Sequence, residues 1–68
     1  MTREILKEYH EKWNDCWKLF RVHAEQEEIQ WENLVKESRK LRIKYKEDKF
    51  VCDILLAFYR ELERIEKK

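Results

Sequence analysis

The side chains best suited to chemistry in this chain are two cysteines and two histidines. Cys16 and His23 lie seven residues apart on one helical face, and His23 and Glu27 form an i, i+4 pair. Such a set can hold a metal ion or activate a thiol. Metal sites, however, usually show more closely spaced ligand motifs. We therefore interpret Cys16 as a small buried residue and His23 as a residue near a helix end, and we predict no metal site.

Hydroxyl nucleophiles are equally poorly supplied. A catalytic Ser or Thr needs a base beside it, and neither Ser38 nor Thr2 has a histidine at helical spacing. The chain contains no Gly and no Pro, which excludes phosphate-binding loops and nucleophile elbows because both need glycine. We expect no catalytic residues, no turnover and no cofactor.

Basic residues gather in the second half of the chain, where they resemble a nucleic-acid recognition helix. They are Arg39, Lys40, Arg42, Lys44, Lys46 and Lys49. These charges are spread around the helix and flanked by acidic residues, and 16 basic against 15 acidic residues leave a net charge of +1. A solvated helix end matched to its dipole explains them as well. We therefore predict that the chain binds a protein partner. A small basic-helix nucleic-acid-binding module is the alternative function.

A set of apolar residues falls off the core face defined by Trp13 and Phe20 if the helical phase is maintained. A contiguous patch of this kind indicates a partner surface. A break of the helix near Ala24 would instead let some of these residues pack the bend. The predicted partner-binding residues are Leu19, Val22 and Ile29 of this set, with Gln26 as a polar contact among them and Trp17 at the opposite edge of the core face.

The element that must organise the fold is the stretch from Phe50 to Leu62. It is apolar around more than half of its helical circumference, so other helices must cover it on more than one side. Its core face carries Val51, Ile54, Leu55, Phe58, Leu62 and Ile65, and its second flank carries Cys52, Leu56 and Tyr59.

Two further helical segments are available to cover it. Thr2 and Asp48 are suitable N-caps, and a break is expected near residues 23–26 because Glu27 would otherwise fall within the apolar stripe. The sequence therefore predicts helices over 3–22, 26–46 and 49–67. These form a single all-α domain, residues 1–68, folded as an up-down-up three-helix bundle.

The alternative fold is a long helical hairpin, monomeric or dimeric, that turns near Asn33 and Leu34. The cysteines distinguish the two folds. In the bundle, Cys16 lies about 21 Å along the first helix and Cys52 about 5 Å along the third, so we predict two free thiols. The hairpin would bring both cysteines level and permit a disulfide.

The composition sets the remaining limits. A chain of 68 residues that is 43% apolar can form one small core. It has no apolar run of about 18 residues, so we expect no membrane span. The N-terminus lacks the continuous apolar region of a signal peptide, which is compatible with cytoplasmic expression, although the sequence assigns no location.

The near-equal amphipathic helices, the Glu- and Lys-rich faces and the caps at Thr2 and Asp48 resemble those of de novo designed helical mini-proteins. The chain departs from that pattern in lacking glycine in its connections and in having two Cys, two His and three Trp. Such mini-proteins are commonly binders or fold scaffolds. The resemblance implies a non-enzymatic protein-binding module or scaffold that uses an aromatic and aliphatic helix face, either for a protein partner or for self-association.

Overall fold

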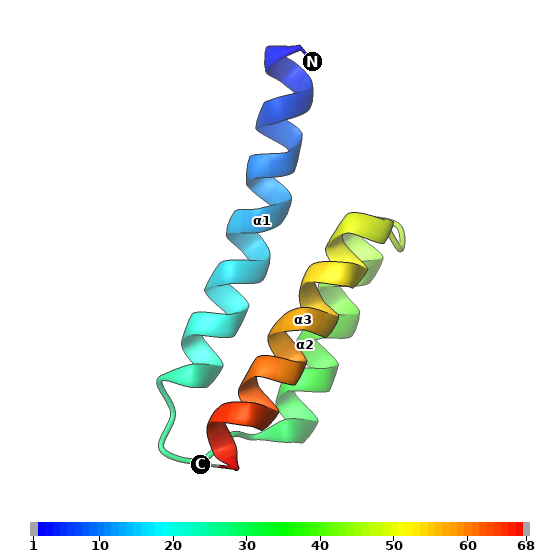
Figure 1. Ribbon diagram of the computed structural model, residues 1–68. Helices are drawn as coiled ribbons and strands as arrows, with labels where there is room; N and C mark the ends of the chain where they lie inside the picture. Colours follow the sequence, from blue (N-terminus) through cyan, green and yellow to red (C-terminus); the bar gives the residue numbers. More distant parts are fainter. Residues whose placement is uncertain (1, 68) are drawn as a thin grey trace.

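The computed structural model describes residues 2–67, and in this range the chain forms three helices (Figure 1). Helix α1 spans Arg3–Ala24, α2 spans Trp31–Lys44 and α3 spans Lys49–Glu66. Consecutive helices run in opposite directions, so that α1 and α3 are parallel. The predicted all-α, up-down-up three-helix bundle is confirmed.

Two of the helix starts are capped by the residues that the sequence predicts. The Thr2 hydroxyl accepts a hydrogen bond from the Ile5 backbone N–H at 3.3 Å, and the Asp48 carboxylate accepts one from the Val51 N–H at 3.1 Å. Each bond satisfies an N–H group that has no partner within its own helix. Local sequence therefore determines where α1 and α3 begin.

The α2–α3 connection turns through the left-handed backbone region without a glycine. Lys46 and Glu47 have φ values of 54° and 58°, which cost a residue with a Cβ conformational energy. The N–H groups of Lys46, Glu47 and Asp48 nevertheless donate to carbonyls at the end of α2. These bonds close the turn and hold α2 and α3 as an antiparallel pair.

The α1–α2 connection lies later in the chain than predicted. Helix α1 continues through Ala24, and the connection spans 25–30 instead of 23–26. The Gln30 side chain makes no capping hydrogen bond, so no local signal marks the start of α2. Tertiary packing determines the start of α2 instead. The Trp31 ring contacts the Tyr59 ring of α3, with centroids 5.2 Å apart, and Leu34 is buried.

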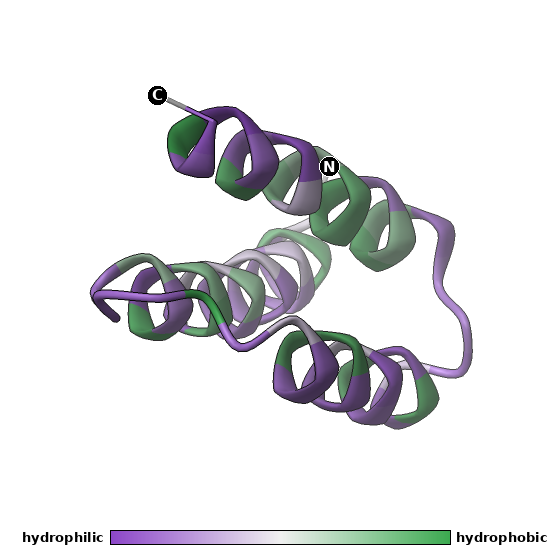
Figure 2. Ribbon diagram, turned by 90° about the horizontal axis from the view of Figure 1, so that it is seen from below, coloured by the Kyte–Doolittle hydropathy of each residue, from purple (hydrophilic) through white to green (hydrophobic). Residues whose placement is uncertain are grey.

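The core is centred on α3, as the sequence predicts, but two parts of the prediction were wrong. Ile65 on the expected core face and Leu56 and Tyr59 on the second flank are 37–50% exposed. Val51, Ile54, Leu55 and Leu62 are buried on α3, and Cys16 of α1 packs with the first three. Figure 2 shows hydrophobic segments of the three helices turned toward one another. Burial of this apolar surface is the main term that stabilises so small a bundle.

The register of α1 against α3 differs from the expected one. The Tyr9 ring contacts the Phe50 ring, with centroids 4.9 Å apart, near the start of α3, so the beginning of α1 has no level counterpart on α3 (Figure 1). Cys16 consequently lies beside the first half of α3 and not far from Cys52. Both thiols are free, as predicted, but the expected axial separation was wrong.

Candidate functional site

Three polar contacts hold α1 in register with the α2–α3 turn. The Lys12 ammonium donates to the Asp48 carboxylate at 3.1 Å, so one carboxylate both caps α3 and binds α1. Three residues further along α1, the Asp15 carboxylate accepts from the Tyr45 hydroxyl at 2.5 Å and from the Lys44 ammonium at 2.9 Å. These contacts join residues about 30 positions apart in sequence and fix how far α1 extends.

The same contacts favour the charged carboxylates. Hydrogen bonds from Tyr45 and then Lys44 lower the pKa of Asp15, and bonds from the Val51 N–H and then from the α1 lysine lower the pKa of Asp48. The bond to Asp15 also raises the pKa of the Tyr45 hydroxyl. The ionisable groups with these shifted pKa values at this end of the bundle are therefore those that hold α1 in register with α2 and α3.

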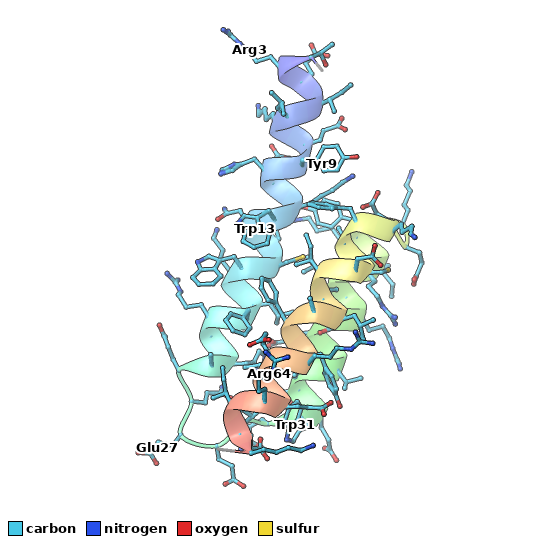
Figure 3. All side chains as sticks on the ribbon, viewed as in Figure 1. Arg3, Tyr9, Trp13, Glu27, Trp31 and Arg64 are labelled. Carbon is cyan, nitrogen blue, oxygen red and sulfur yellow. The ribbon has the colours of Figure 1, made fainter. Side chains whose placement is uncertain are left out.

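With this register, the N-terminal part of α1 extends beyond the α2–α3 pair. In Figure 3, Arg3 lies at the free end of the helix and Trp31 lies at the opposite end of the bundle. The molecule is accordingly elongated, with dimensions of 41 × 20 × 16 Å. This extension leaves the start of α1 without a covering helix. Further along α1, apolar side chains that contact α3 stay partly exposed.

The partly exposed apolar side chains form one face of α1, which we call the aromatic strip. Its members are Leu6, Tyr9, Trp13 and Trp17, at i, i+3, i+7 and i+11, and 41–55% of each residue is exposed. That spacing places them on one side of the helix. Large apolar residues grouped in this way are typical of protein-binding surfaces.

The lower half of the strip is held in place by Phe58 of α3. The Phe58 ring stacks on Phe20 with centroids 4.6 Å apart and also contacts Trp13 at 5.6 Å and Trp17 at 6.4 Å. These ring contacts restrict the two tryptophans and leave one side of each exposed. The strip is thus presented in an ordered arrangement before any partner binds.

The structure separates the five residues that the sequence grouped as a partner surface. Trp17 belongs to the aromatic strip, whereas Leu19 packs against the core, contrary to the outward position predicted for it. Val22 is 49% exposed. Gln26 and Ile29 line a hollow beside the last turn of α3, because α1 ends before them and they leave its helical phase.

Cys16 is not placed to act as a nucleophile. Its side chain is fully buried, and burial, followed by the nearby Asp15 and Cys52 charges, raises the pKa of the thiol to about 11. A thiol reacts as the thiolate, so Cys16 is almost entirely in its unreactive form at neutral pH. The interpretation of Cys16 as a small buried core residue is confirmed.

His23 connects α1 to α2 inside the bundle. It is 2% exposed, and its Nε2 lies 2.5 Å from Oε2 of Glu37. The i, i+4 pair with Glu27 does not form, because Glu27 lies in the α1–α2 connection. Over residues 2–67 the structure brings together no group of three or more His, Cys, Asp and Glu side chains that could hold a metal ion. His23 therefore acts as a buried contact between α1 and α2.

Sequence reasoning missed most of the aromatic strip. Leu6 and Tyr9 share the helical phase of the predicted core face of Trp13 and Phe20 closely enough to form one broad face with it, so the sequence did not single them out. The available signal was the mismatch in helix length. Helix α1 has 22 residues and α2 has 14, but this mismatch becomes visible only once the start of α2 is known.

Comparisons with protein-family models, with curated proteins and with solved structures find no match to this chain. In the described part of the chain, no helix combines the length and the apolar character that crossing a bilayer requires. Function must therefore be argued from the surface chemistry of the chain itself.

Proposed function

We propose that this chain is a non-enzymatic protein-binding module whose extended α1 lays the aromatic strip into an apolar groove of a partner protein. One observation carries the proposal: four large apolar side chains at i, i+3, i+7 and i+11 are 41–55% exposed on a helix that projects past its own bundle. Apolar anchors at such intervals are the recognition pattern of helix-in-groove complexes.

The chemistry of the strip supports this mode of binding. Tryptophan and tyrosine bury large areas with few rotatable bonds, which makes them frequent hot spots. The strip spans about 16 Å along the helix. Arg3, His10 and Arg21 stand three or four residues from strip members and therefore border it. A partner groove with acidic edges would complement that border.

The test begins by capturing the partner and ends in a binary measurement. A photocrosslinking amino acid at position 9, in place of Tyr9, is used to capture proteins that contact the strip. The captured partner is then purified and titrated against the unmodified chain and against the double variant Leu6→Lys/Trp13→Lys. We expect the double variant to bind at least about 30-fold more weakly, because hot-spot truncations cost about 2 kcal/mol or more.

A matched variant separates this surface from the one predicted by sequence. The double variant Val22→Lys/Ile29→Lys adds the same charges on the residues expected from the sequence. It should bind the partner with nearly unchanged affinity. A loss of binding in this variant alone, with an unchanged melting temperature, would contradict the proposal. A chain that is only a scaffold would capture no specific partner, which would contradict it as well.

A further inference from the structure

A second surface lies between α2 and α3 and is lined by residues of these two helices alone. Each helix contributes four positions at i, i+3, i+4 and i+7, so the groove is two turns long, about 10 Å. Its apolar part includes Val35, Leu56 and Tyr59, which are 48%, 50% and 37% exposed. The contact between the Trp31 and Tyr59 rings borders this apolar end.

The size of the groove limits what it can bind. Its volume is about 200 Å³, whereas small-molecule sites usually enclose about 300–1,000 Å³. A groove of this size accommodates one or two side chains from a larger partner. Because both walls are helices at regular spacing, a third helix lying along them would meet the groove with residues one turn apart.

The other end of the groove is positively charged. Arg39 and Arg42 line it, and no acidic residue does. Within residues 2–67, neither arginine forms an ion pair with an acidic side chain. The Nε atom of Arg42 is buried without a hydrogen-bond partner, so no acceptor among the described residues holds the guanidinium at that atom. A carboxylate is the acceptor that fits a guanidinium best, because it can accept two parallel N–H bonds.

We infer that this groove binds an acidic amphipathic helix of a partner protein. One apolar side chain of that helix occupies the space beside Val35, Leu56 and Tyr59. Carboxylates one to two turns further along pair with Arg39 and Arg42, which stand four and seven residues from Val35 on α2. The inference rests on the proposed protein-binding role for the class of its partner, but it uses a different face of the bundle.

Two other occupants fit the groove less well. The exposed aromatic strip of a second copy is bordered by Arg3 and Arg21, so positive charge would meet positive charge. A nucleic acid would contact arginine through its phosphates, but it would leave the apolar end of the groove without a complementary surface. The acidic helix satisfies both ends at once.

The test uses two synthetic helical peptides of equal length. The acidic peptide carries Leu at i and i+4 and Glu at i+7 and i+8, and the basic peptide carries Lys in place of both Glu residues. Cys52 lines the groove, so occupancy is read from the rate at which Cys52 is alkylated, and affinity is read from calorimetric titration. We expect the acidic peptide to bind and to slow alkylation at saturation by about tenfold. The basic peptide should do neither.

Charge-reversal variants make the test specific. Arg39→Glu should weaken binding of the acidic peptide by about tenfold and should strengthen binding of the basic peptide. Lys36→Glu makes the same charge change on the same helix but outside the groove lining, and it should change affinity by less than about twofold. Leu56→Lys should abolish binding while lowering the melting temperature by no more than about 8 °C, because half of Leu56 is exposed.

Several outcomes would overturn the inference. Equal binding of the two peptides, or equal effects of Arg39→Glu and Lys36→Glu, would remove the role of the guanidinium groups. Protection of Cys52 by duplex DNA, but not by the acidic peptide, would assign the groove to nucleic acid. The strip variant Leu6→Lys/Trp13→Lys should bind the acidic peptide normally. Failure of the peptide alone would therefore reject the groove and leave the aromatic strip standing.

Discussion

Replacing Leu62 by Ala should remove a large share of the stability of the bundle. Leu62 is fully buried on α3, and the substitution deletes three carbon atoms from its side chain. Their transfer free energy is about 2.4 kcal/mol, and the cavity left behind raises the expected loss to about 2–5 kcal/mol. A chain of this length typically has a free energy of unfolding of roughly 3–10 kcal/mol, so the substitution should remove about a fifth of it or more.

Leu56 provides a matched control on the same helix. The change Leu56→Ala deletes the same atoms, but half of this residue is already exposed, so the loss should be about 1 kcal/mol or less. Urea unfolding followed by far-ultraviolet circular dichroism measures both free energies of unfolding. The melting temperature of Leu62→Ala should fall by at least about 10 °C.

The comparison tests which face of α3 is the core. Equal losses for the two variants would mean that α3 is covered on both faces, as in a dimer that buries Leu56. A larger loss for Leu56→Ala would refute the packing described above. Repeating the unfolding over a range of protein concentrations separates these outcomes, because the stability of a dimer depends on concentration.

Two further predictions concern titration and thiol reactivity. The pKa of Asp15 is lower in the folded state than the ordinary 3.8, so its contribution to stability is present above that value and is lost as the pH falls through the folded pKa. Asp15→Asn should lower the free energy of unfolding at neutral pH and flatten the acid limb of a stability-versus-pH curve. Asp53→Asn, at an exposed position, should leave the free energy of unfolding at neutral pH nearly unchanged. An alkylating reagent should modify Cys52, which is partly exposed, and spare the buried Cys16 until the protein unfolds. Peptide mapping measures the alkylation of both sites. Equal alkylation rates of the two cysteines in the native protein would contradict the burial of Cys16.

The sequence was sufficient wherever the controlling interaction is local. The side chains of Thr2 and Asp48 cap helices through bonds to residues three positions ahead, and such bonds are readable from the chain. The core role of the stretch from Phe50 to Leu62 follows from its helical periodicity and from its apolar excess. The three-helix topology then follows because so broad an apolar surface needs two covering helices. The start of α2 was not readable, because Gln30 makes no side-chain capping bond there.

Only the tertiary structure decided the register of α1, and with it the candidate site. An amphipathic helix repeats its apolar face at every turn, so α1 can slide along α3 by whole turns and still present an apolar face. The contact of Lys12 with Asp48, 36 positions apart, selects one of these registers. That choice brings Cys16 beside the first half of α3 and leaves Leu6 beyond the end of the α2–α3 pair. The exposure of Leu6 at the free end of the aromatic strip therefore depends on long-range contacts, which helical periodicity alone does not encode.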